Sequence, residues 1–190
     1  MVHITLHSFP ALLKQSIRQR LSGFAHDKCG VSAIEFALIL PLMLALYFGG
    51  VELTQGIIVD RKVKLTARTV ADLVSQVATI NNTGVDEALG ASAAILAPFS
   101  TADATVIVSV VEIDNKGTAK IVWSRANKGT GHKKGDSVTV PAALKTPGTF
   151  VVWGEASYNY TPAVGFIIGP LTLSDQIFMR PRLSETVTKT

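Results

Sequence analysis

The hydrophobic residues of this chain are concentrated in one stretch near its N-terminus, from Val31 to Val51. Glu35 is the only charged residue in that stretch. A helix needs about 20 apolar residues to cross the hydrocarbon core of a bilayer. The stretch therefore predicts one transmembrane helix. Pro41 lies inside it and predicts a kink, because proline removes a backbone hydrogen bond from a helix.

The pattern becomes amphipathic from Glu52 onward. Apolar residues at spacings of three and four form a single stripe, which consists of Val63, Ala67, Val70, Val74 and Val77. This spacing predicts that the helix continues beyond the membrane with one buried face. We expect it to end at Asn81–Gly84, where asparagine and glycine are typical stop residues. A second helix is expected from Val85 to Ala97, closed by Pro98.

The period of the pattern changes after Pro98. Runs rich in β-branched and aromatic residues predict four strands, at residues 104–113, 118–124, 149–160 and 171–182. Residues 114–117 are typical of a hairpin turn, residues 127–137 of a surface loop, and the last residues of a tail. Helices followed by consecutive strands predict an α+β fold with a small antiparallel sheet of about four strands. Aromatic residues at strand positions, Trp123, Trp153, Tyr158 and Tyr160, favour packing over a binding platform.

These patterns divide the chain into four parts. They are a basic leader (1–30), a transmembrane helix (31–51), an amphipathic extension with the second helix (52–98), and a strand-rich domain (99–190). Lysines and arginines precede the span, whereas none follows it before Arg61. Because positive charge stays on the cytoplasmic side, we expect a cytoplasmic N-terminus and a C-terminal domain across the membrane. The leader either forms a short amphipathic helix or is disordered and recognised by its charge.

Composition excludes several functions. The formal net charge of the 190-residue chain is +4, and much of it belongs to the leader, which has four Lys/Arg and one Asp. No nucleic-acid partner is expected, because nucleic-acid binding would need a basic patch within the folded domain. The single cysteine, Cys29, lies in the leader. The remainder therefore has no disulfide framework and no cysteine-based metal site.

Candidate chemistry is sparse. Residues 129–136 (GTGHKKGD) lack the spacing of a phosphate-binding loop, and we interpret them as a solvated loop. His132 is the only histidine outside the leader, which argues against a histidine metal set and against Ser-His-Asp catalysis. A pair of carboxylates for acid–base catalysis is left open by the sequence, although no spacing identifies two particular residues. We expect no catalytic residue, no metal, no cofactor and no small-molecule substrate.

The junction of leader and span carries a resemblance to a known family. Gly30 stands at this junction, and Glu35 is the fifth residue after it. This arrangement resembles the prepilin peptidase site of type IV pilin precursors. The longer run GVSAIEFALILP, with its Glu35-Phe36 pair and Pro41, resembles the opening of TadE-like pseudopilins of the tight-adherence (Flp) pilus system. Three segments within residues 158–182 resemble the end of the same domains.

The resemblance implies a function and a set of partners. It implies cleavage between Gly30 and Val31 by a prepilin peptidase, and roles for Glu35 and Phe36 in processing or assembly. It implies a non-enzymatic minor pseudopilin, anchored in the bacterial inner membrane with its domain in the periplasm, that helps to assemble an Flp-type pilus. The implied partners are the peptidase, the major Flp-type pilin, a sister pseudopilin and pilus platform proteins. Pro41 is then either the kink of an ordinary anchor or a point that bends or melts when subunits pack.

Two other interpretations stay open. The chain could be an uncleaved bitopic protein whose periplasmic domain binds a partner, and a mature N-terminus separates this interpretation from the first. A membrane-tethered enzyme has the least support. Whether a pseudopilin of this kind enters the fibre or stays at its base is left open by the sequence.

Overall fold

The computed structural model describes residues 28–162, 165 and 169–190. The expected leader therefore lies almost entirely outside the described residues. The chain divides into two compact units between Phe48 and Gly49. The first unit contains the N-terminal part of helix α2 (Lys28–Ser75), and the second contains the rest of this helix and all of the sheet.

Helix α2 confirms the predicted amphipathic stripe. Within the second unit, Val63, Ala67, Val70 and Val74 are fully buried or nearly so. The predicted end of the helix is wrong, because α2 ends at Ser75 and not at Asn81–Gly84. Asn81 instead begins the next helix, α3 (Asn82–Leu96), where its side-chain oxygen accepts a hydrogen bond from the Gly84 N–H. Asparagine serves both as a stop residue and as an N-cap, which explains the error.

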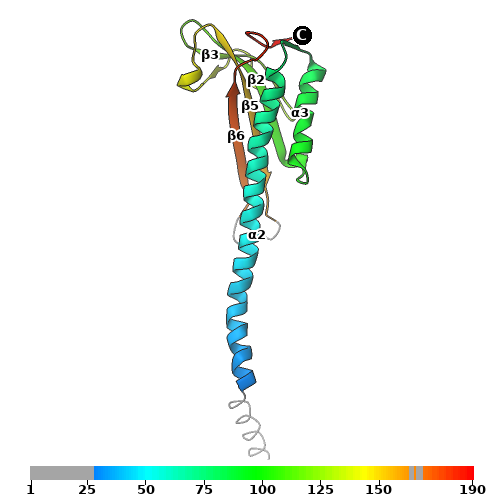
Figure 1. Ribbon diagram of the computed structural model, residues 1–190, viewed down its shortest axis with the longest axis vertical. Helices are drawn as coiled ribbons and strands as arrows, with labels where there is room; N and C mark the ends of the chain where they lie inside the picture. The colour runs from blue at the N-terminus through cyan, green and yellow to red at the C-terminus, as the bar shows by residue number, and fades with distance from the viewer. Residues whose placement is uncertain (1–27, 163–164, 166–168) are drawn as a thin grey trace, which may run out of the picture. The chain divides into compact units, whose positions relative to one another are not determined.

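Helix α3 confirms the second predicted helix, with its start three residues earlier than expected. Pro98 follows its end, as predicted. The Lys62 Nζ of α2 donates hydrogen bonds to the backbone oxygens of Ile95 and Ala97, at 2.8 and 2.7 Å. These carbonyls lie at the C-terminal end of α3, where a helix leaves acceptors unsatisfied. Lys62 therefore both caps α3 and holds it beside α2 (Figure 1).

The sheet is antiparallel and has five strands in the order β4-β3-β2-β5-β6. Their bounds are β2 (Ala104–Ile113), β3 (Ala119–Ala126), β4 (Ser137–Val138), β5 (Thr149–Tyr160) and β6 (Leu171–Met179). The α+β class and the antiparallel sheet are confirmed. Two predicted strands, 104–113 and 149–160, have the bounds that were expected. The fourth ends three residues early, before Pro181, which has no N–H for a ladder. The sheet has one strand more than the four that were expected. The additional strand, β4, has only two residues and therefore gives no periodic signal in the sequence.

The C-terminal residues are not a free tail. Strand β7 (Thr188–Lys189) pairs in parallel with β1 (Thr79–Ile80). Val187 is buried, and its carbonyl accepts a hydrogen bond from the Trp123 Nε1–H at 2.9 Å. A two-residue strand gives no periodic signal, so the pattern of the sequence could not predict this pairing.

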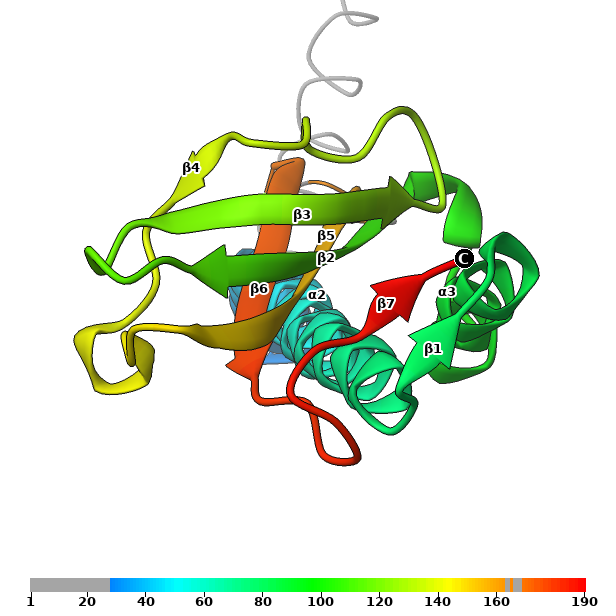
Figure 2. The same ribbon diagram turned by 90° about the horizontal axis from the view of Figure 1, so that it is seen from above.

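The core of the second unit lies between the two helices and one face of the sheet. Valines of β2 and β5 meet the buried stripe of α2 and the apolar face of α3. Figure 2 shows the C-terminal part of α2 and α3 on the same side of the sheet. Gly154 of β5 permits this contact, because a Cβ added there would lie 2.6 Å from the Ala67 carbonyl oxygen and 2.8 Å from the Ala71 Cβ. The helix and the sheet therefore approach each other closely at Gly154.

A second apolar cluster covers part of the opposite face. It contains Val111, Ile113, Ile121, Val140, Val151 and Trp153. The loop after β3 folds over this face, and its His132 ring stacks on the Trp153 ring at 4.7 Å between centroids. The loop is largely exposed, as expected, and only Gly131 and His132 are partly buried. The four aromatic residues expected to pack are all buried.

Candidate processing and assembly site

The predicted processing site lies in the first described turn of α2. Gly30 and Val31 are both helical, and α2 begins at Lys28. The Val31 side chain is 54% exposed. Within the described residues, the Gly30–Val31 bond therefore lies in the first turn of the long helix.

The two residues that are expected to act in processing or assembly follow one turn later. Glu35 is four residues after Val31, so their side chains share one face of the helix. Both Glu35 and Phe36 are exposed in the isolated chain. The spacing places the Glu35 carboxylate one turn from the nitrogen that cleavage after Gly30 would release.

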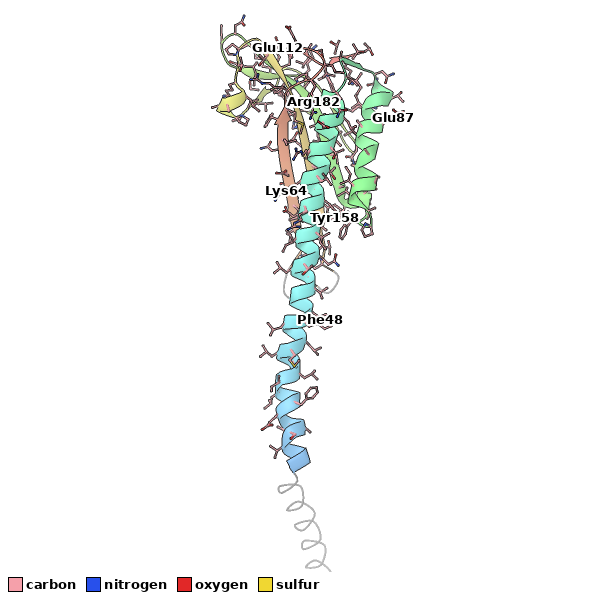
Figure 3. The ribbon with its side chains drawn as sticks, in the orientation of Figure 1. Phe48, Lys64, Glu87, Glu112, Tyr158 and Arg182 are labelled. Atoms are coloured by element: carbon pink, nitrogen blue, oxygen red, sulfur yellow. The ribbon has the colours of Figure 1, made fainter. Side chains whose placement is uncertain are left out.

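The segment after Phe36 has the properties of a membrane span. Apolar side chains project from the helix on all sides up to Phe48 (Figure 3). The most apolar 18-residue window of α2 has a mean hydropathy of 2.1 and no residue buried within the protein. Helix α2 continues through Pro41, whose missing N–H leaves the carbonyl of Ala37 without its usual helical donor. Such a surface is stable only if lipid or another helix covers it.

The described residues outside this site bear on two chemical possibilities, a metal site and a pair of carboxylates. They contain no group of three or more His, Cys, Asp or Glu side chains that could hold a metal ion. Glu155 and Asp175 line a cavity of about 440 Å³ at the sheet. Glu155 is registered with Gln176, so Asp175 is one position away and projects to the opposite face. The two carboxylates therefore do not form an acid–base pair.

The domain contains a polar contact, between His132 and Glu155, for which the sequence gives no signal. The His132 Nε2 lies 2.5 Å from a Glu155 carboxylate oxygen. Burial raises the pKa of Glu155 above its ordinary value, and the hydrogen bond and charge of His132 oppose that rise. Trp153 lies between the rings of His132 and Phe178. His132 and Glu155 are 23 residues apart, and no local spacing in the sequence indicates such a contact.

Comparison with known proteins agrees with the N-terminal part of this description. The model of the TadE family, described as TadE-like protein, matches residues 30–72. The matched range begins at Gly30 and includes Glu35, Phe36 and Pro41. No curated protein and no solved structure matches the chain. The match confirms the resemblance to TadE-like proteins in this segment, which contains the long apolar part of α2.

Proposed function

We propose that the chain is a minor pseudopilin that a prepilin peptidase cleaves between Gly30 and Val31. In this proposal it is anchored in the bacterial inner membrane, its second unit lies in the periplasm, and it helps to assemble an Flp-type pilus. The single observation that carries the proposal is the coincidence of two ranges. The TadE-like match begins at Gly30, and the apolar stretch of the sequence begins at Val31.

The proposed role of the protein is structural rather than enzymatic. A surface-exposed apolar helix next to a folded domain is suited to lateral packing with other helices in a membrane. The proposed partners are the prepilin peptidase, the major Flp-type pilin, a sister pseudopilin and the platform proteins. The family match and the apolar helix support these partners as a class.

Glu35 has a specific role in this proposal. Before cleavage the nitrogen of Val31 is an uncharged amide, and after cleavage it is an α-amino group, which has a pKa of about 7.7–8.0 in model compounds. An ionised carboxylate in the middle of a membrane helix costs about 3 kcal/mol on insertion scales. Pairing with the new ammonium group, of the same chain or of a neighbouring subunit, offsets that cost. Cleavage would thus produce the charge that allows Glu35 to enter a packed helical assembly.

The test replaces Glu35 by glutamine, which keeps the shape of the side chain and removes its charge. We expect Glu35→Gln to leave the ratio of precursor to mature chain near normal and to reduce the yield of surface pili several-fold. Glu87→Gln is the matched control, because Glu87 is an exposed carboxylate of α3 outside the matched segment. Normal piliation with Glu35→Gln would show that the charge is dispensable and that Glu35 simply reaches the headgroups.

An uncleaved membrane protein with a partner-binding domain is the alternative function. The extensive burial in the second unit is compatible with it, since the core is complete without the first unit. The length of the chain in the membrane fraction separates the two functions.

A further inference from the structure

Within the second unit, strand β5 runs along the C-terminal part of α2. Near the middle of the strand, Gly154 faces Ala67 and Ala71. At its end, the ring of Tyr160 lies 3.8 Å from the Cβ position of Gly56, and its hydroxyl group lies 3.4 Å from the Glu52 carbonyl oxygen. Strand β6 begins beside Tyr160, because Leu171 is its partner in the register. The β5–β6 end of the sheet is therefore level with residues 52–56 of α2.

This level corresponds to the headgroup layer of a bilayer. The run from Val31 to Val51 is about 31 Å long at 1.5 Å per residue, which matches a hydrocarbon core of about 30 Å. Residues 52–56 then lie about 2–8 Å beyond the core. The headgroup region on each side of a bilayer is about 5–8 Å thick, so the β5–β6 end of the sheet falls within it.

The exposed residues of α2 at this level carry no charge; Thr54 and Gln55 are polar, and large hydrophobic residues are exposed beside them. Leu53 is 56% exposed and Leu171 is 37% exposed, and Ile57 is exposed as well. We call these three residues the membrane-proximal rim. The charged residue of α2 within this level, Glu52, is buried, and the next are Asp60 and Arg61. No charged residue lies between Tyr160 and Leu171 in the sequence.

We propose that the membrane-proximal rim rests on the lipid headgroup layer, so that the second unit is seated on the membrane surface. This inference rests on the membrane anchor of the proposed function. Its basis is continuity, because the rim follows the apolar surface of the span without an exposed charged residue of α2 in between; Glu52, which does lie between them in the sequence, is buried. A lipid interface favours such uncharged apolar side chains beside a span. The periplasmic unit would then have one preferred face toward the bilayer and would present the rest of its surface to partners.

The experiment measures contact with lipid at single positions. The full chain carries Cys29→Ser and one new cysteine, Leu53→Cys or Leu171→Cys, each labelled with a fluorophore and reconstituted into phospholipid vesicles. Leu183→Cys is the matched control, because Leu183 is a leucine with 73% exposure. The Arg182 N–H next to it donates to the Ser75 carbonyl oxygen, which is about 36 Å from Val51 along the helix. Lipids carrying a quencher near the headgroup report the contact.

We expect headgroup quenching at residues 53 and 171 to be at least twofold stronger than at residue 183. Equal, weak quenching at all three positions in chains that float with the vesicles would overturn the inference and leave the anchor intact. Labels at residues 53 and 171 that are shielded from aqueous quenchers, but are not quenched by the lipid-borne quencher, would also overturn the inference. That result would show that a second protein chain, and not lipid, covers the rim. Failure of the chain to float with vesicles would overturn both the inference and the proposed anchor. A near-ultraviolet circular dichroism spectrum equal to that of the Cys29→Ser parent confirms that each labelled chain is folded.

Discussion

Gly154 offers the simplest test of the way in which α2 packs on the sheet. A methyl group at this position would lie 2.6 Å from the Ala67 carbonyl oxygen and 2.8 Å from the Ala71 Cβ. Both atoms belong to the buried face of α2, and neither can rotate away as the end of a flexible side chain could. The helix or the strand must therefore shift if Gly154 is replaced by alanine.

The expected loss of stability follows from two opposing effects. Adding a methylene-sized group to a packed core costs about 1–3 kcal/mol, and the fixed backbone neighbours place Gly154→Ala in the upper part of this range. Alanine restrains the unfolded chain more than glycine does, which returns about 0.5–1 kcal/mol. We expect a net loss of about 1–2 kcal/mol, which corresponds to a fall in melting temperature of roughly 5 °C for a unit of this size.

The assay is thermal unfolding of the full chain in detergent micelles, followed by tryptophan fluorescence. Gly90→Ala is the matched control, because Gly90 lies inside α3, is exposed and has no atom within 4 Å of its Cβ position. Alanine is favoured over glycine in a helix by about 1 kcal/mol, so this variant should melt at a higher temperature. A Gly154→Ala chain as stable as the unmodified protein would refute the close packing of α2 on β5.

Two further predictions concern polar contacts of the second unit. Lys62→Met keeps the aliphatic stem but removes both hydrogen bonds to the end of α3. We expect the free energy of unfolding to fall by about 1–2 kcal/mol and amide hydrogen exchange in the last turn of α3 to become faster. The control variant Arg61→Met should behave as the unmodified chain does. Burial raises the pKa of Glu155 above 4.5, so its contribution to stability is present below pH 4.5 and is lost as the pH rises through the raised pKa. The free energy of unfolding in urea should therefore fall for the unmodified chain, relative to Glu155→Gln, as the pH rises from 4.5 through the raised pKa of Glu155. Parallel pH profiles would contradict that expectation.

Local patterns in the sequence predicted most of the regular structure. The buried stripe of α2 and the strands at 104–113 and 149–160 follow from periodicity, because each has a long run with one period. Asn81 shows where such patterns fail, since the same residue type ends one helix and begins another. The pairing of β1 with β7 depends on a contact between residues about 110 positions apart, which no local pattern indicates.

The placement of the candidate residues on one helix was predictable for a different reason. Gly30, Glu35 and Pro41 lie within one continuous segment, so their spacing in the sequence is also their spacing on the helix. The contact between His132 and Glu155 could not be predicted in this way, because it joins a loop to a strand. The membrane-proximal rim likewise required the structure, since Leu53 and Leu171 are brought to one level only by the packing of β5 along α2.

The N-terminus of the chain in the membrane fraction tests the central claim most directly. Intact-mass measurement of the protein, expressed with and without a prepilin peptidase, gives the length of the mature chain. The proposed function predicts a chain that begins at Val31 when the peptidase is present and accumulates as precursor in the Gly30→Leu variant, because a bulky side chain replaces the glycine next to the cleaved bond. A chain that still begins at Met1 in the presence of an active peptidase would contradict the pseudopilin function.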